Sequence, residues 1–213
     1  MNKKAVIFDL DGVICSTDKY HYIAWKAMAD SIQVYFDENI NHRLRGVSRM
    51  ESLEIILERA KREFTEEEKI QLTEKKNQIY QKMLNQMSES DLSGEVWNTL
   101  KRLKESGILL AIGSSSKNTK LILERLGLKD FFDIVIDGND ISNSKPDPEV
   151  FLKAADSLGV PVEECLVVED ANAGIQAAYA GGFQTVGVQE AAGNEHTTFP
   201  VKHFDEIIKL IEA

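Results

Sequence analysis

The most restrictive feature of the sequence is a long helical segment that separates the first strand from all the others. Residues 6–10 begin as an apolar run that is typical of a strand buried on both faces of a parallel sheet. Residues 19–87 then carry helical periodicity and contain no proline. Because one strand cannot form a sheet alone, it must pair with strands that follow the helical segment. The helical segment is therefore expected to be an insertion.

From Gly94 onward the pattern alternates between amphipathic helices and short apolar strands. Helices are expected over residues 96–105, 119–126, 148–158, 171–180 and 204–211, and strands over 108–112, 134–136, 166–168 and 185–188. This alternation predicts a parallel sheet covered by helices on both faces. The expected fold is α/β, with a Rossmann-like sheet as the core domain (residues 1–16 and 90–213) and an inserted all-helical cap domain (residues 17–89). Within the cap, Ser48 with Glu51 and Thr65 with Glu68 match capping boxes that would start two helices.

Composition limits the partners that the chain can have. It has 25 basic and 35 acidic residues, and the net charge of −10 argues against nucleic acid or an anionic membrane as a partner. Its two cysteines, Cys15 and Cys165, are far apart and match neither a disulfide framework nor a zinc site. No apolar run approaches the length of a membrane span. We expect a cytoplasmic monomer that acts on a small molecule.

Polar residues follow four of the expected strands at their carboxyl ends. In chain order they are Asp9 and Asp11; Ser114, Ser115, Ser116, Lys117 and Asn118; Ser144, Lys145 and Pro146; and Glu169 and Asp170. The carboxyl ends of parallel strands meet at one edge of a sheet, where the binding sites of such folds form. Asp9 and Asp11 point the same way because strand side chains alternate, and two such close carboxylates favour a dication with oxygen ligands.

This set of groups is suited to phosphoryl transfer. Asp9 can act as the nucleophile, and Asp170, with Glu169, can hold Mg²⁺ beside it. Lys145 and the metal would offset charge on the phosphoryl oxygens, and Ser114 would donate a hydrogen bond to them. Asp11 is left to move a proton. Each group alone could also be a helix cap or an exposed turn, but four of them in order at four strand ends indicate a site.

These residues resemble a known family. The segments Asp9-Leu10-Asp11-Gly12-Val13, Ser114, Ser144-Lys145-Pro146 and Glu169-Asp170 are similar, in this order, to the four motifs of the haloacid dehalogenase-like phosphotransferases. The resemblance implies an aspartyl-phosphate intermediate, a helical cap over the site, and Mg²⁺ at a site that includes Asp9, Asp11, Glu169 and Asp170. Most members of the family are phosphatases.

The cap resembles the sugar-phosphate mutases of that family, the β-phosphoglucomutases, in residues 20–26, 46–53 and 76–77, together with 114–118 of the core. The resemblance implies interconversion of β-glucose 1-phosphate and glucose 6-phosphate through glucose 1,6-bisphosphate. It implies that Arg49, Ser116, Lys117 and Asn118 hold the non-transferring phosphate, that Lys76 and Ser52 line the sugar side, and that His21 and Thr17 couple cap closure to Asp11. Ser115, Trp25 and Gly46 belong to the same implied binding set.

Two other functions remain open. A sugar-phosphate phosphatase would use the same Asp9 chemistry, and a catalytically inactive module could sense a phosphosugar. A mutase must bind a second phosphate, and an arginine can bind phosphate through two hydrogen bonds. Arg49 would lie in the first turn of its helix, where the helix dipole makes a basic residue unfavourable. This placement favours a role in binding a ligand over a charge that only faces water. Lys76 lies in the charged run 74–76 and could instead face water, His21 could be an ordinary helix residue, and Trp25 could belong to the cap core.

Overall fold

The computed structural model describes residues 3–212, and its centre is a parallel sheet. The strands are β1 (Ala5–Phe8), β2 (Leu109–Gly113), β3 (Ile134–Ile136), β4 (Cys165–Glu169), β5 (Gln184–Gly187) and β6 (Phe199–Pro200), in the spatial order β3-β2-β1-β4-β5-β6. Every neighbouring pair is parallel. The expectation that the first strand joins the later ones is confirmed, since β1 lies between β2 and β4. The short edge strand β6 is an addition that the sequence pattern does not predict.

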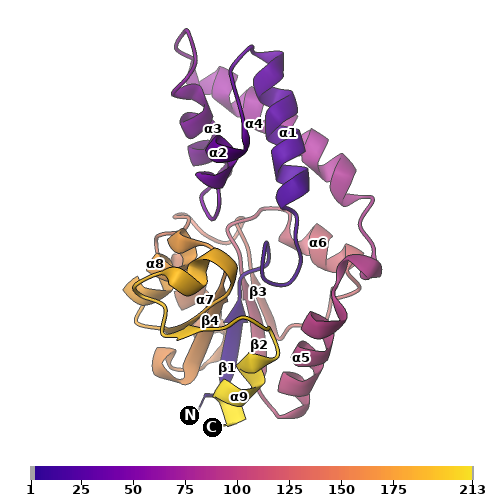
Figure 1. The fold of residues 1–213 in the computed structure, drawn as a ribbon, viewed down its shortest axis with the longest axis vertical. Coiled ribbons are helices and arrows are strands. Elements are labelled where there is room, and N and C mark those ends of the chain that lie inside the picture. Colours follow the sequence, from indigo (N-terminus) through magenta and orange to yellow (C-terminus); the bar gives the residue numbers. More distant parts are fainter. Residues whose placement is uncertain (1–2, 213) are drawn as a thin grey trace.

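Alternate side chains of β1 enter two different cores, as expected for a strand covered on both faces. Val6 and Phe8 pack with the apolar residues of α5 (Gly94–Glu105), α6 (Thr119–Arg125) and α9 (Glu206–Glu212). Ala5 and Ile7 pack with α7 (Glu149–Leu158) and α8 (Asn172–Ala180) on the other face. Figure 1 shows these layers, with both termini at the end of the sheet far from the cap. The predicted α/β fold class is confirmed.

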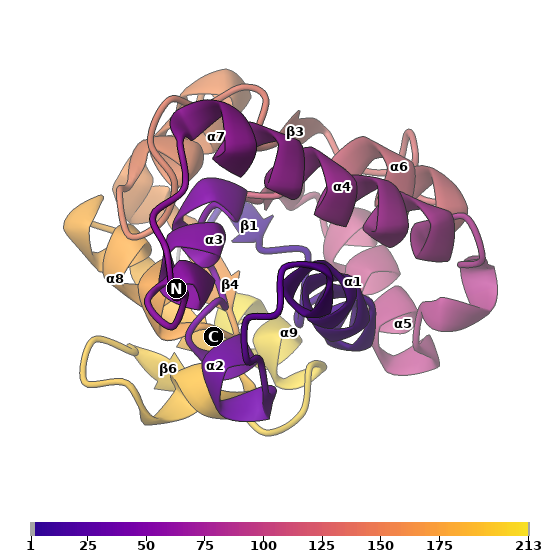
Figure 2. The ribbon, with the colours of Figure 1, turned by 90° about the horizontal axis from the view of Figure 1, so that it is seen from above.

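The inserted helices are α1 (Asp18–Ser31), α2 (Glu38–His42), α3 (Arg49–Leu57) and α4 (Glu66–Leu84). They stand above the carboxyl edge of the sheet, and the ends of β1 and β4 are seen between them from above (Figures 1 and 2). They have an apolar core of their own, which includes Trp25, Met28, Leu53 and Ile56. Both predicted capping boxes are present, at the starts of α3 and α4. Among residues 3–212, no helix combines the length and the apolar character that crossing a bilayer would need.

Three short 3₁₀ helices complete the described part of the chain: η1 (Glu89–Asp91), η2 (Val162–Glu164) and η3 (Gln189–Gly193). The first returns the chain from the cap to the core. The third follows β5 and lies at the carboxyl edge of the sheet, where the backbone N–H of Ala191 donates to the carbonyl of Asp170 at 3.1 Å. It is therefore fixed directly beside the polar strand ends.

Candidate active site

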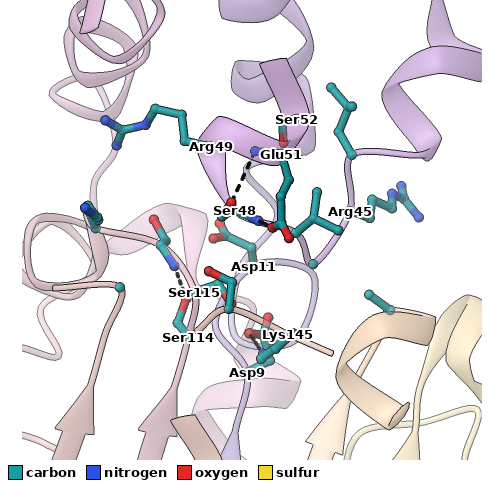
Figure 3. Close-up of a pocket in the computed structure, with 18 of the residues that line it drawn as sticks. Asp9, Asp11, Arg45, Ser48, Arg49, Glu51, Ser52, Ser114, Ser115 and Lys145 are labelled. Atoms are coloured by element: carbon teal, nitrogen blue, oxygen red, sulfur yellow. Dashed lines mark hydrogen bonds and ion pairs between the residues drawn. The ribbon is translucent and has the colours of Figure 1, made fainter. Parts of the chain in front are cut away.

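A cavity of about 920 Å³ lies between the carboxyl edge of the sheet and the cap helices. It brings together nearly every residue that the sequence pointed to (Figure 3). The predicted residues that line it are Asp9, Asp11, His21, Trp25, Gly46, Arg49, Ser52, Lys76, Ser114, Ser115, Ser116, Lys117, Asn118, Lys145, Glu169 and Asp170. Thr17 does not line the cavity but donates its hydroxyl hydrogen to Asp11 Oδ1. The four strand ends thus meet in one place, as the parallel sheet requires.

At the base of the cavity, a buried lysine lies among buried carboxylates. Lys145 Nζ lies 2.5 Å from Asp9 Oδ1 and 2.5 Å from Glu169 Oε1. Oxygens of Asp9, Glu169 and Asp170 all lie within 4.8 Å of one another. Burial lowers the pKa of Lys145, but the charges of Asp9 and Glu169 outweigh burial and leave the pKa above its usual value. Lys145 is therefore held as a cation at the point where phosphoryl oxygens would gather.

Two glycines allow these carboxylates to lie so close together. Gly12 has φ +90°, and a Cβ on it would lie 2.1 Å from Asp170 Oδ2. A Cβ on Gly174, in the first turn of α8, would lie 1.8 Å from Glu169 Oε1. Both distances are far below contact, so any side chain at either position would displace an acidic group of the site. The sequence signal for Gly12 was its place in the first motif, whereas Gly174 carried none.

The acidic group has the character of a site for a hard dication. Burial, then the charges of Asp9 and Glu169, raise the pKa of Asp170 to about 8. Burial also raises the pKa of Glu169 to about 7, against the opposing effect of Lys145. Three buried carboxylates with one lysine leave an excess of negative charge, and their clustered oxygens are the donors that Mg²⁺ prefers. Asp11, which was also expected among the ligands, lies outside this group of three.

These raised pKa values predict how metal and pH act on stability. A carboxyl whose pKa is higher in the folded than in the unfolded protein favours folding at low pH, and this contribution is lost as pH rises toward about 8. Mg²⁺ replaces the protons, so it should stabilise the protein more at pH 8 than at pH 5.5. At a concentration of about 100 Kd we expect a rise in Tm of about 5–10 °C at pH 8.

Thermal unfolding with and without Mg²⁺ at the two pH values is the measurement. Asp170→Asn is the matched variant, because it removes one ionisable group of the acidic cluster and keeps its size. It should lose most of the Mg²⁺ shift and unfold with a weaker pH dependence. Equal Mg²⁺ shifts at both pH values in the unmodified protein would contradict the assignment of this cluster as the metal site.

Asp11 is placed to exchange protons. Burial and the neighbouring charge of Asp9 raise its pKa to about 7, while the hydrogen bond from Thr17 acts in the opposite direction. A carboxyl with a pKa near 7 can both donate and accept a proton at neutral pH. The acid/base role of Asp11 stays a prediction, and the hydrogen bond from Thr17 fixes the orientation of its carboxyl.

Lys76 does not face water, although it lies in a charged stretch of α4. It is 2% exposed, and its Nζ lies 3.0 Å from His21 Nδ1. The same nitrogen lies over the rings of Tyr80 and Trp25, at 4.4 and 4.9 Å from their centroids. Burial, reinforced by the charge of Arg49, lowers the pKa of Lys76 to about 7. Trp25 belongs to the cap core and also lines the cavity, and its place in the binding set stays a prediction.

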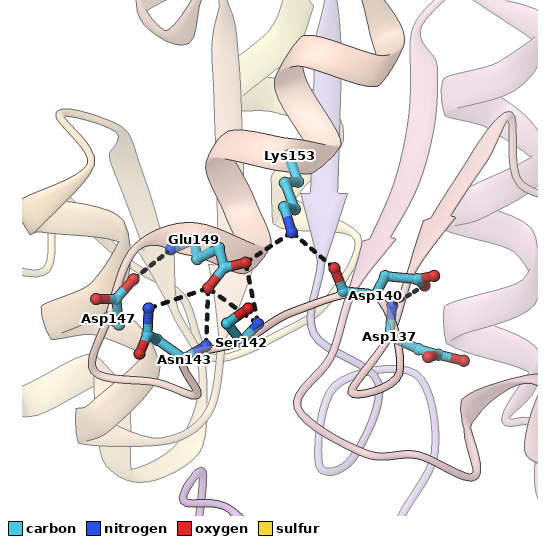
Figure 4. Close-up of polar contacts among 7 residues, drawn as sticks. All are labelled: Asp137, Asp140, Ser142, Asn143, Asp147, Glu149 and Lys153. Carbon is cyan, nitrogen blue, oxygen red and sulfur yellow. Dashed lines mark hydrogen bonds and ion pairs between the residues drawn. The ribbon is translucent and has the colours of Figure 1, made fainter.

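The loop that carries Lys145 is anchored by α7 (Figure 4). The Glu149 carboxylate accepts hydrogen bonds from the backbone N–H groups of Ser142, at 3.0 Å, and Asn143, at 2.7 Å. Lys153 pairs with Glu149 at 2.6 Å and donates to the carbonyl of Asp140 at 2.7 Å. Glu149 and Lys153 thus fix a loop whose residues Ser142 and Asn143 line the cavity. Sequence reasoning missed this anchor, whose one signal was the i,i+4 spacing of Glu149 and Lys153.

The cap also contacts the core beyond the cavity floor. Asn118 donates to Asn77 Oδ1 and accepts from Gln81 Nε2, both at 2.9 Å. One N–H of the Asn118 side-chain amide is therefore engaged by α4; its second N–H is not, and the predicted role of Asn118 in binding phosphate stays a prediction. On the other side, Arg45 of the loop before α3 pairs with Asp18 and with Glu190. Gln81, Arg45 and Asp18 were not singled out from the sequence.

Comparisons with known proteins agree with this geometry. Residues 3–182 match the family model described as haloacid dehalogenase-like hydrolase. The β-phosphoglucomutase of Bacillus subtilis is 43% identical over 87% of this chain and 83% of its own length. The phosphorylated carbohydrates phosphatase of Thermotoga maritima is 30% identical over 86% of this chain and 83% of its own. The crystal structure of β-phosphoglucomutase from Clostridium difficile superposes with a TM-score of 0.92 at 36% identity, over 99% of this chain and 96% of that one.

Proposed function

The chain belongs to the haloacid dehalogenase-like hydrolase family, and from this we propose that it is a Mg²⁺-dependent mutase that interconverts β-glucose 1-phosphate and glucose 6-phosphate. Two β-phosphoglucomutases, at 43% and 36% identity, are nearer to it than the phosphatase at 30%. In this proposal residues 17–89 act as a cap domain, glucose 1,6-bisphosphate is the intermediate, and the protein works as a cytoplasmic monomer.

The observation that carries the proposal is that the Arg49 side chain lines the cavity without a partner among the described residues. It lies at the start of α3 and lines the same cavity as Asp9, and no hydrogen bond or ion pair connects it to another described residue. Burial lowers its pKa, although as an arginine it stays charged. Arg49 is half-buried in the cavity wall, and a cation there without a partner among the described residues favours a bound anion. Asp9 already defines the position of the reacting phosphoryl group. Arg49 therefore supports a second phosphate position, which a mutase needs and a phosphatase does not.

The reaction follows from the groups at the cavity floor. In one half, an Asp9 oxygen forms a bond to phosphorus, the bond from phosphorus to the sugar oxygen breaks, and Asp11 gives its proton to that oxygen. In the other half, Asp11 takes the proton of a sugar hydroxyl, that oxygen forms a bond to phosphorus, and the bond from phosphorus to the Asp9 oxygen breaks. Lys145 and the Ser114 hydroxyl hold the phosphoryl oxygens. Asp9, Glu169 and Asp170 would hold Mg²⁺, which supplies positive charge against the transferring group.

The role of Arg49 gives a prediction that separates the two activities. Arg49→Ala should raise KM for β-glucose 1-phosphate by about 10- to 100-fold, the loss expected for a desolvated arginine–phosphate contact. Hydrolysis of a small phosphate donor such as acetyl phosphate needs no second phosphate site and should stay within about two-fold of the unmodified enzyme. Arg49→Lys keeps the charge but not the two parallel N–H donors of arginine. Its KM for β-glucose 1-phosphate should therefore lie between those of the unmodified enzyme and Arg49→Ala.

The proposed function is tested by following two products together. The purified protein receives Mg²⁺, β-glucose 1-phosphate and a trace of glucose 1,6-bisphosphate, and glucose 6-phosphate and inorganic phosphate are measured over time. A mutase forms glucose 6-phosphate with little phosphate. Release of phosphate with free glucose would instead identify the phosphatase alternative, which the 30% identical phosphatase keeps as the second candidate.

A further inference from the structure

The cap carries two arginines that line the cavity and point in opposite directions. Arg49, on α3, extends to one side, and Arg45, on the loop that precedes α3, extends to the other, away from the carboxylates at the cavity floor (Figure 3). Because the two side chains point in opposite directions, we do not expect them to contact the same group of a bound ligand. Arg49 has no partner among the described residues, whereas Arg45 has two acidic partners.

The partners of Arg45 lie on both sides of the boundary between cap and core. One is Asp18, the first residue of α1 in the cap. The other is Glu190 of η3 in the core, whose Oε2 lies 3.6 Å from Arg45 Nη1. Beside Arg45, Gly46 has φ +76°, and a Cβ on it would lie 3.2 Å from the Cβ of Ala173 in α8. The loop around Arg45 thus rests directly on the core.

The core side of this contact is firmly tied to the acidic strand ends. Gln189 Nε2 donates to the carbonyl of Gly12 at 2.6 Å. The N–H of Ala191 donates to the carbonyl of Asp170 at 3.1 Å, and Asn172 Nδ2 lies 3.3 Å from Glu190 Oε1. The turn that carries Glu190 is therefore held beside the first and fourth motifs. On the opposite side of the cap, Asn118 of the core forms neutral hydrogen bonds with α4. The Arg45–Glu190 pair, in contrast, is a charged contact between cap and core.

We propose that the Arg45–Glu190 ion pair is a latch that holds the cap closed over phosphorylated Asp9 and keeps water from it. This inference rests on the proposed function, because a mutase must keep its phosphoryl group until a sugar hydroxyl attacks. If the cap opens, a water oxygen bonds to phosphorus, the bond from phosphorus to Asp9 breaks, and inorganic phosphate leaves. The latch then sets the proportion of phosphoryl groups lost to water.

Glu190→Gln is the direct test, since it removes the charge, keeps the shape and leaves the Arg45–Asp18 pair in place. The readout is the ratio of inorganic phosphate released to glucose 6-phosphate formed in the two-product assay. An exposed ion pair of this kind should change the opening equilibrium by about two- to five-fold, and the ratio should rise by that factor. Glu190→Lys, which places like charges together, should raise it further.

Salt gives a second readout that a merely structural role would not move. Raising ionic strength from about 0.02 M to about 0.5 M screens the pair, so the ratio for the unmodified enzyme should rise toward that of Glu190→Gln, whose own ratio should change little. Glu195→Gln is the matched control: its side chain is 87% exposed in the same segment, and it should behave as the unmodified enzyme.

Different results would contradict the proposed latch and the proposed mutase function. If the unmodified enzyme forms glucose 6-phosphate but Glu190→Gln has the same ratio and the same salt response, the latch is wrong and the mutase stands. If the unmodified enzyme releases phosphate and forms no glucose 6-phosphate, the proposed function itself is wrong, and the latch that rests on it is withdrawn.

Discussion

Asp9→Asn is expected to abolish turnover, with kcat/KM for β-glucose 1-phosphate falling by more than about 10⁴-fold. The amide has nearly the shape of the carboxylate but cannot form the aspartyl phosphate, and removal of an enzymatic nucleophile typically costs this much or more. Initial rates of glucose 6-phosphate formation give the number. Labelling from ³²P-glucose 1,6-bisphosphate followed by acid quench should show no phosphorylated protein.

Two controls make the result interpretable. Asp30→Asn changes an exposed aspartate of α1, which pairs with Lys26, and should leave the rate within about two-fold. Calorimetry should show that Asp9→Asn still binds glucose 6-phosphate, because Arg49 and the cavity walls are intact. A variant at Asp9 with substantial residual turnover would mean that another group is the nucleophile. If the unmodified protein bound the sugar phosphate but showed no turnover, the alternative of a binding module would be revived.

Lys145→Met is expected to have the second-largest effect, on stability as well as rate. Lys145 is 1% exposed and contacts two buried carboxylates, and breaking such a buried pair costs about 3–5 kcal/mol. The loss should be larger at pH 8 than at pH 5.5, because the carboxyls left behind take up protons more readily at the lower pH. Without its cation, phosphoryl transfer should slow by about 10²- to 10³-fold.

Urea unfolding at the two pH values, together with kcat, measures this prediction. Lys4→Met is the matched control, since Lys4 forms an exposed pair with Glu164 and its removal should cost less than about 1 kcal/mol. A stability loss for Lys145→Met that is no larger than that of Lys4→Met would contradict the account of Lys145 as the counter-ion of the buried cluster.

The strand ends of this site could be predicted because parallel strands place their carboxyl ends at one edge whatever the details of packing. Asp9, Ser114 and Asp170 come directly after or close to the end of an apolar run, and Lys145 lies in the loop that follows the third strand, so their convergence needed only the sheet topology. The capping boxes at Ser48 and Thr65 were equally accessible, since they depend on local backbone groups alone.

The rest depends on contacts between distant segments. Lys76 lies in a charged run, and only the packing of α4 against α1 shows that its side chain is buried over Trp25 and Tyr80. The contact of Arg45 with Glu190 joins a cap loop to a turn of the core. The two-residue strand β6 is too short for a periodic pattern and depends on its pairing with β5.

The most direct test of the central claim asks where the phosphoryl group on Asp9 goes. Enzyme is loaded from ³²P-glucose 1,6-bisphosphate in the presence of Mg²⁺, chased with excess unlabelled β-glucose 1-phosphate, quenched in acid and separated. The account predicts that the label appears in glucose 1,6-bisphosphate and then in glucose 6-phosphate, with little in inorganic phosphate. Label that passes to inorganic phosphate at the same rate with and without the sugar would contradict it, and the protein would then be a phosphatase.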